Sequence, residues 1–225
     1  MRRARPAGRN GFQDRAEWAV RPALFQLRYA LWRMGGRAGL VPHVHKQAII
    51  RDYARRHRLS VLVETGTYRG DMVAAMRNTF REIHSIELDP DLHRSAADRF
   101  AGSPHVFVYQ GDSATVMPAV LKGLQEPALF WLDGHFSGGV TAKAGTDTPV
   151  RAEIAEIFGA GGHAHVVLID DARLFTGEGD YPSLGELESL VRGFRPQASV
   201  TAEDDVIRVV DSPAAAAAAR QVSAG

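Results

Sequence analysis

The stretch LSVLVETGTYRGDMVAAM, residues 59–76, decides the fold of this chain. It begins as an apolar run that is typical of a buried strand and ends in an acidic residue, Glu64. It then turns through two glycines, Gly66 and Gly70, and resumes with apolar residues at helical spacing. A strand that turns through glycine into a helix is typical of an α/β unit that approaches a ligand at the turn.

From residue 59 onward, strand-like and helix-like segments alternate. The strand candidates are LSVLVE, EIHSIE, HVFVYQ, ALFWLD and HVVLID, and helices are expected over 70–79, 90–101, 113–125, 149–159 and 183–194. Asp89-Pro90 and Thr148-Pro149 mark helix starts. The last two runs, ASVTAE and DVIRVV, are nearly contiguous and predict an antiparallel hairpin. This order predicts a Rossmann-like α/β fold, with a mainly parallel sheet, an antiparallel edge hairpin and helices on both faces.

The composition excludes several classes of protein. The 225 residues are 45% hydrophobic and 24% charged, as in ordinary globular proteins. The chain has no cysteine, which excludes disulfides, thiolate metal sites and cysteine nucleophiles. No apolar run approaches the roughly 18 residues that span a bilayer, and no signal-peptide core follows the initial arginines. We therefore expect a cytoplasmic protein with no stable membrane insertion.

Charge is divided unevenly along the chain. Residues 1–58 hold 14 Lys/Arg and 3 Asp/Glu, whereas residues 59–225 hold 13 and 23. No nucleic-acid motif accompanies the basic part, so we expect a solvated arm and no nucleic-acid partner. The expected organisation is a disordered basic arm over 1–11, an amino-terminal helical cap over 12–58, the α/β domain over 59–211 and a low-complexity tail over 212–225. The cap is also a candidate homodimer contact or a candidate lid over the acceptor.

The predicted strands end in acidic residues. In open α/β sheets ligands bind outside the carboxyl ends of the strands, so these side chains are expected to cluster there. The six acids are Glu64, Glu87, Asp112, Asp133, Asp170 and Asp171. A single terminal acid is also explained as the cap of the following helix.

The nature of the ligand follows from the first two strand ends. Glu87 follows Glu64 by 23 residues, which suits a carboxylate that accepts hydrogen bonds from ribose hydroxyls. The glycines form Gly66-x-x-x-Gly70 and lack the G-x-G-x-x-G pattern of a pyrophosphate cradle. An acid at Glu64 also disfavours a doubly charged phosphate. A cationic or zwitterionic nucleoside fits better.

Five motifs in this order resemble those of the class I S-adenosylmethionine-dependent methyltransferases. They are VLVETGTYRGDMV, IHSIELDPDLHRSA, VYQGDSA, FWLDGH and VVLIDDA, and the resemblance covers about Leu59 to Val210. It implies a seven-stranded sheet and an S-adenosylmethionine-binding domain over 59–211. The resemblance also implies three groups of cofactor contacts: Glu64, Gly66, Thr67, Tyr68 and Gly70 on the methionine and ribose part, Glu87 on the ribose hydroxyls, and Asp112 with Ser113 on the adenine.

Within that superfamily the chain is more similar to the metal-dependent O-methyltransferases of the catechol and macrolide-sugar types. These also carry an acid at the end of the fourth strand and an acidic pair at the end of the fifth, here Asp133, Asp170 and Asp171. Three carboxylates on adjacent strand ends suit Mg²⁺, which prefers oxygen ligands and can activate a substrate hydroxyl. The alternatives are that Asp133 only touches the cofactor and that Asp170-Asp171 caps a helix.

The catechol pattern places a basic lysine three residues after the fourth-strand aspartate, where this chain has Phe136. His135 is the nearest group with a suitable pKa, and Lys143 is a second candidate for the base. Both lie in the long connection over 133–150, which we interpret as an acceptor-recognition loop.

The expected function is S-adenosylmethionine-dependent methyl transfer to a hydroxyl of a small polar or glycosylated acceptor, assisted by Mg²⁺. The alternative is a Rossmann-like protein that binds a nucleoside or nucleotide-sugar without methyl transfer, because one fold hosts many activities. A nicotinamide oxidoreductase is a third option, weakened by the missing glycine fingerprint.

Overall fold

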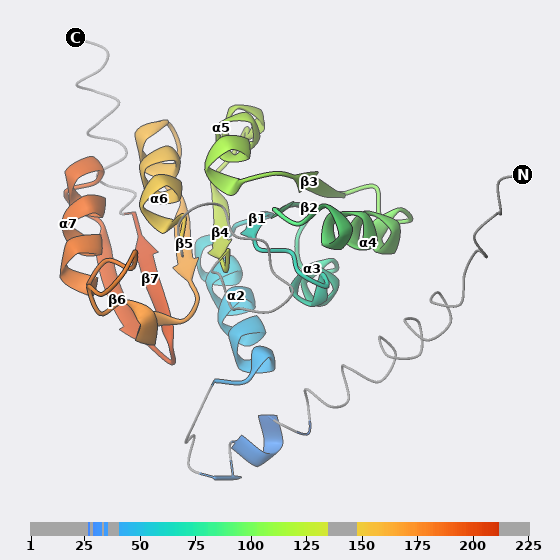
Figure 1. The fold of residues 1–225 in the computed structure, drawn as a ribbon, viewed down its shortest axis with the longest axis horizontal. Helices are drawn as coiled ribbons and strands as arrows, with labels where there is room; N and C mark the ends of the chain where they lie inside the picture. The colour runs from blue at the N-terminus through green and yellow to red at the C-terminus, as the bar shows by residue number, and fades with distance from the viewer. Residues whose placement is uncertain (1–26, 28, 33, 36–40, 135–147, 212–225) are drawn as a thin grey trace, which may run out of the picture. The chain divides into compact units, whose positions relative to one another are not determined.

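The computed structural model describes residues 27, 29–32, 34–35, 41–134 and 148–211 (Figure 1). The chain divides into two compact units, residues 1–48 and 49–225, with the boundary inside helix α2, His43–His57. In the smaller unit the rings of Tyr29, Trp32 and His45 lie together, with centroids 5.1 to 6.1 Å apart. Among the described residues, no helix combines the length and apolarity that a membrane crossing requires.

The larger unit is built on a seven-stranded sheet (Figure 1). Its strands are β1 Val61–Thr65, β2 Glu82–Glu87, β3 Val106–Gln110, β4 Ala128–Leu132, β5 Val166–Ile169, β6 Ser199–Glu203 and β7 Val206–Val210. Their order in the sheet is β3-β2-β1-β4-β5-β7-β6. Strands β1 to β5 are parallel, and β7 runs antiparallel to both β5 and β6. The predicted mainly parallel sheet with an antiparallel edge hairpin is confirmed.

Helices alternate with the parallel strands as the sequence predicts. They are α3 Asp71–Met76, α4 Pro90–Phe100, α5 Ser113–Gly123, α6 Val150–Gly159 and α7 Leu184–Phe194, with a short 3₁₀ helix, η1 Ala172–Leu174, after β5. Helix α4 begins at the predicted Asp89-Pro90 pair, because the Asp89 carboxylate accepts hydrogen bonds from two backbone N–H groups of its first turn. Helix α6 begins directly after Pro149, as expected from Thr148-Pro149.

The helices form one layer on each face of the sheet (Figure 1). The second half of α2 packs with α3 and α4 on one face, where Leu62 of β1 points. Helices α5, α6 and α7 pack on the other face, where Val61 and Val63 point. Every residue of β1 and β4 is buried, which explains why β4 and the first three residues of β1 are apolar without alternation.

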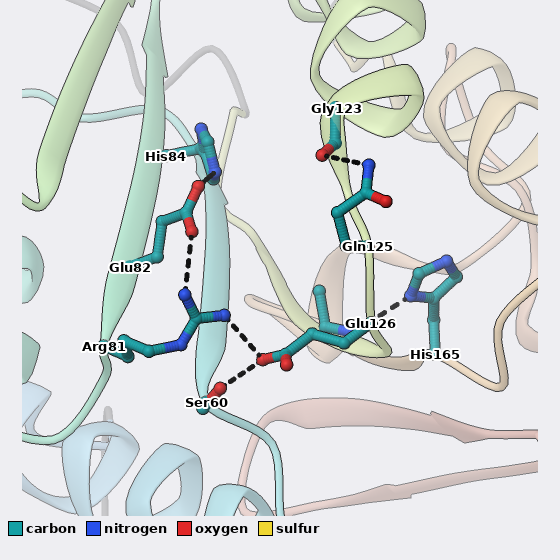
Figure 2. A network of polar contacts seen from close by, with 9 residues as sticks. Ser60, Arg81, Glu82, His84, Gly123, Gln125, Glu126 and His165 are labelled. Carbon is teal, nitrogen blue, oxygen red and sulfur yellow. Dashed lines mark hydrogen bonds and ion pairs between the residues drawn. The ribbon is translucent and has the colours of Figure 1, made fainter.

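The amino ends of the central strands are held by a network of polar side chains (Figure 2). Glu126 accepts a hydrogen bond from Ser60 and forms an ion pair with Arg81 at 3.1 Å. Arg81 also lies 3.5 Å from Glu82, which in turn contacts His84 at 2.8 Å. These residues tie the segments that enter β1, β2 and β4 to one another. The amino edge of the sheet is therefore occupied by internal contacts.

Candidate functional site

The carboxyl edge of the sheet collects the acids that the sequence places at strand ends. Strand β1 lies between β2 and β4, and the chain crosses over in opposite directions on its two sides. Backbone N–H groups continue the ladder beyond the strands: Asp133 donates to Thr65 at 3.0 Å, and Asp170 donates to Leu132 at 3.0 Å. In such sheets the reversal of strand order opens the crevice in which ligands bind. The candidate site is therefore the end of β1 and its neighbours.

Glu64 is buried on the face of the sheet that carries α3, with 2% of its surface exposed. Its Oε2 accepts a hydrogen bond from the Ser85 hydroxyl at 2.5 Å, and that hydroxyl lies 2.6 Å from the hydroxyl of Thr67. Burial raises the pKa of Glu64 to about 8, against the Ser85 hydrogen bond and with help from the charges of Glu87 and Asp71. Burial therefore favours the neutral, protonated form of Glu64 near pH 7.

Glu87 ends β2 and holds the turn that follows β1. One of its oxygens accepts a hydrogen bond from the backbone N–H of Tyr68 at 2.7 Å, and the other accepts from Asp89 N–H at 2.9 Å. Burial raises the pKa of Glu87, although these backbone hydrogen bonds oppose the shift. Each carboxylate oxygen keeps a second lone pair for a further donor. Tyr68 lies in the turn that Glu87 holds. This residue is 39% exposed and has a backbone φ of 49°.

Gly66 and Gly70 are explained by contacts within the protein. Gly66 has a φ of 81°, and a Cβ there would lie 2.4 Å from the carbonyl oxygen of Asp133. At Gly70, with φ 72°, a Cβ would lie 2.6 Å from the Phe100 ring of α4. Both positions therefore require glycine before any ligand arrives. Gly70 lies in the turn that begins α3 and packs against helix α4, and the contact at Gly66 joins the ends of β1 and β4.

Asp112 and Ser113 begin α5. The Asp112 carboxylate caps the helix by accepting a hydrogen bond from Ala114 N–H at 2.9 Å. Ser113 is the first helical residue and is buried. The capping explanation of a strand-end acid thus holds for Asp112, while the predicted contact of both residues with adenine stays a prediction.

A buried acid that sequence reasoning missed lies on the opposite face of β1 from Glu64. Glu153 of α6 has 1% of its surface exposed, and burial raises its pKa to about 7. The Ser113 hydroxyl faces it and opposes the shift, whereas the charge of Asp112 adds to it. Its signal in the sequence is positional: Glu153 stands at a core position of the helix, at the spacing of Val150, Ile154 and Ile157.

Two oxygens of this second group complete no hydrogen bond. Glu153 Oε1 and Thr65 Oγ1 are buried and have no hydrogen-bonding partner within the described part of the chain. Gly134 lies directly beside them, since a Cβ there would be 3.3 Å from Thr65 Oγ1 and 3.6 Å from Glu153 Oε1. An unsatisfied buried polar group costs about 1–3 kcal/mol, so native proteins rarely keep one without a purpose.

The assignment of Asp133, Asp170 and Asp171 as magnesium ligands stays a prediction. Within residues 27–35, 41–134 and 148–211, as far as they are described, no three His, Asp or Glu side chains are placed to hold a metal ion. The Asp171 carboxylate instead pairs with Arg173 at 2.8 Å, and Arg173 also pairs with Asp205 of the β6–β7 turn. The Asp171 carboxylate is therefore paired with a guanidinium of the protein itself.

Asp170 has a structural contact of its own. Its carboxylate accepts a hydrogen bond from the backbone N–H of Asp171 at 2.7 Å, and the residue is 4% exposed. Asp171 itself adopts a left-handed backbone with φ 56° and precedes the 3₁₀ helix η1. The two candidate bases, His135 and Lys143, lie outside the described residues, as does most of the connection over 133–150.

Comparison with solved structures supplies the fold family. No protein-family model matches the chain, and no curated protein sequence matches it either. An O-methyltransferase from Bacillus cereus in complex with S-adenosylhomocysteine is similar at a TM-score of 0.56 and 10% identity, covering 84% of this chain and 91% of that one. The S-adenosylhomocysteine-bound methyltransferase PaMTH1 of Podospora anserina has a TM-score of 0.54 and 14% identity, covering 94% and 100%.

A third solved structure is the O-methyltransferase TomG from Streptomyces achromogenes, in complex with S-adenosylmethionine. Its TM-score is 0.51 at 15% identity, covering 84% of this chain and 89% of that one. The chain has the class I methyltransferase fold. This methyltransferase fold is the one that the five sequence motifs imply, and at identities of 10–15% the likeness is one of fold.

Proposed function

We propose that the chain is an S-adenosylmethionine-dependent methyltransferase that acts on a hydroxyl of a small polar or glycosylated acceptor. This proposal rests on one observation. The Glu87 carboxylate accepts a hydrogen bond from the backbone N–H of Tyr68, in the turn after β1, beside the point where the strand order reverses. A carboxylate held there by two backbone N–H groups is preorganised to accept hydrogen bonds from ribose hydroxyls. The bound cofactors of the structural neighbours support the same choice of ligand.

The residues of the chain would contribute binding and proton handling. When bound, S-adenosylmethionine supplies a methyl group on a positively charged sulfur. Glu87 would hold the ribose, which orients the nucleoside for in-line transfer. Glu64, neutral below a pKa of about 8, would release its proton when a cationic group binds beside it. The acceptor hydroxyl must lose its proton to a base, for which His135 and Lys143 are our candidates.

Calorimetric titration with S-adenosylhomocysteine tests the proposal. Charge-assisted hydrogen bonds contribute about 1.5–3 kcal/mol, so Glu87→Ala should weaken binding at least tenfold. The matched control is Asp91→Ala on the adjoining helix α4, because the Asp91 side chain is 83% exposed and pairs with Arg94 on the surface. The control should bind as the wild type does. Binding of NAD in place of S-adenosylhomocysteine would overturn the proposed function, and an unchanged affinity of Glu87→Ala would remove Glu87 from the site.

A further inference from the structure

Glu153 has a position that packing alone does not explain. The residues at equivalent spacing on α6, Val150, Ile154 and Ile157, are fully buried hydrophobic residues of the core. An ionisable side chain in such a position is unfavourable unless it interacts with a polar partner. Glu153 therefore carries a function that a leucine at the same position would not provide.

The neighbours of Glu153 come from elements that border the candidate site. Thr65 is the last residue of β1, Ser113 is the first residue of α5, and Gly134 follows β4. The two hydroxyls face the Glu153 carboxyl, and the α-carbon region of Gly134 adjoins both Glu153 Oε1 and Thr65 Oγ1. One buried carboxyl thus adjoins the ends of β1 and β4 and the start of α5.

This group contains two buried oxygens without a partner in the described part of the chain. Glu153 Oε1 and Thr65 Oγ1 find no hydrogen-bonding partner among the described residues, although both are fully buried. The corresponding group on the other face of β1 has two short contacts, one between Ser85 and Glu64 and one between Ser85 and Thr67. The two faces of β1 therefore differ, because only the Glu64 group has all its hydroxyls in contact with a polar partner within the described residues.

We propose that Glu153 is a positioning residue for the cofactor, which acts through Ser113 and Thr65 to set the separation of the β1 end and the α5 start. This inference rests on the proposed function, because a nucleoside must fit between those two segments. A neutral carboxyl can donate one hydrogen bond and accept others, so it can join two hydroxyls from different elements. An ionised carboxyl would instead repel the Asp112 carboxylate, which is the charged group that faces it from α5.

The test measures the affinity for S-adenosylhomocysteine of three variants. Glu153→Ala should weaken binding about tenfold, with a matching rise in the KM for S-adenosylmethionine and little change in kcat. Glu153→Gln keeps the shape and the hydrogen bonds, so its affinity should stay within about threefold of the wild type at pH 7. Glu156→Ala is the control on the same helix, at a partly exposed position, and should change nothing.

A pH series separates positioning from mere stability. Wild-type affinity should fall as the pH rises from 6 to 8, because Glu153 becomes charged beside Asp112. Glu64 also titrates near pH 8, but it is present in both proteins, so the difference between wild type and Glu153→Gln isolates Glu153. Identical pH profiles would overturn the inference, even if Glu153→Ala failed to fold.

A double-mutant comparison checks the route through Ser113. If Glu153 acts through this hydroxyl, Ser113→Ala should weaken binding, and the double variant should be little worse than either single one. Fully additive losses would contradict that route. Wild-type protein that fails to bind S-adenosylhomocysteine would defeat the proposed function, whereas normal binding by Glu153→Ala would defeat only this inference.

Discussion

The two faces of strand β1 each bury one glutamate at the carboxyl end of the sheet, and they do so differently. On the α3 face, Glu64 is hydrogen-bonded to Ser85, which contacts Thr67. On the α6 face, Glu153 and Thr65 leave one oxygen each without a partner among the described residues. Both acids have a raised pKa because both are buried. The comparison shows that two acids buried to the same extent differ in whether their neighbours complete their hydrogen bonds.

The largest expected effect comes from adding a side chain at Gly66, where the ends of β1 and β4 meet. Gly66→Ala would force a Cβ to within 2.4 Å of the Asp133 carbonyl oxygen at a φ of 81°. Overpacking and the left-handed backbone together should lower the free energy of unfolding by roughly 2–5 kcal/mol. Urea denaturation measures this loss. Gly161→Ala is the control, because its φ is 72° but the added Cβ meets nothing within 4 Å, so only the smaller backbone cost should appear.

The next effect concerns the pH dependence of stability on the α3 face. The folded protein holds the Glu64 proton up to a pKa of about 8, whereas the unfolded chain loses it near 4.5. The free energy of unfolding should therefore fall as the pH rises from 4.5 to 8, by up to a few kcal/mol. Glu64→Gln cannot ionise, so its stability should fall less over this window in urea denaturation at pH 5 and pH 8.5. A wild-type slope that persists unchanged in Glu64→Gln would show that Glu64 is ionised in the folded protein.

The smallest effect distinguishes the hydroxyls beside Glu64 from the hydroxyl beside Glu153. Thr67→Val removes a hydroxyl that lies 2.6 Å from Ser85 and should cost about 1 kcal/mol. Thr65→Val removes a buried hydroxyl without a partner in the described region and should stabilise the ligand-free protein by a similar amount. Thermal denaturation of the two variants shows whether each is less stable or more stable than the wild type. Destabilisation by both substitutions would mean that the two faces are equally complete.

The fold could be predicted because its signals are local. Strands β1 and β4 are buried on both faces and so read as continuous apolar runs, and Asp89-Pro90 carries its own capping chemistry. The site could be predicted only in part. The strand-end acids reach one edge as expected, but the partner of Asp171 is Arg173, which also binds Asp205 from a distant hairpin.

The other contacts that the sequence does not predict have the same cause. The carbonyl that requires glycine at position 66 belongs to Asp133, and the hydroxyls that face Glu153 belong to β1 and α5. Each of these partners is distant in the sequence from the residue that it contacts, so a local sequence pattern cannot predict the contact. A polar residue at a core position of a helix, as at Glu153, was the one local sign available.

The pairing register of β1 with β4 gives the protein a built-in optical probe. Glu64 is the register partner of Trp131, which is fully buried and lies in the same core layer as Leu62. Residues opposite one another on adjacent strands point to the same face, so the indole stands beside the ionisable carboxyl. The other two tryptophans, Trp18 and Trp32, precede α2 and can be replaced by phenylalanine. The emission of Trp131 would then report the charge of Glu64 without any added label, both during pH titration and as a ligand enters.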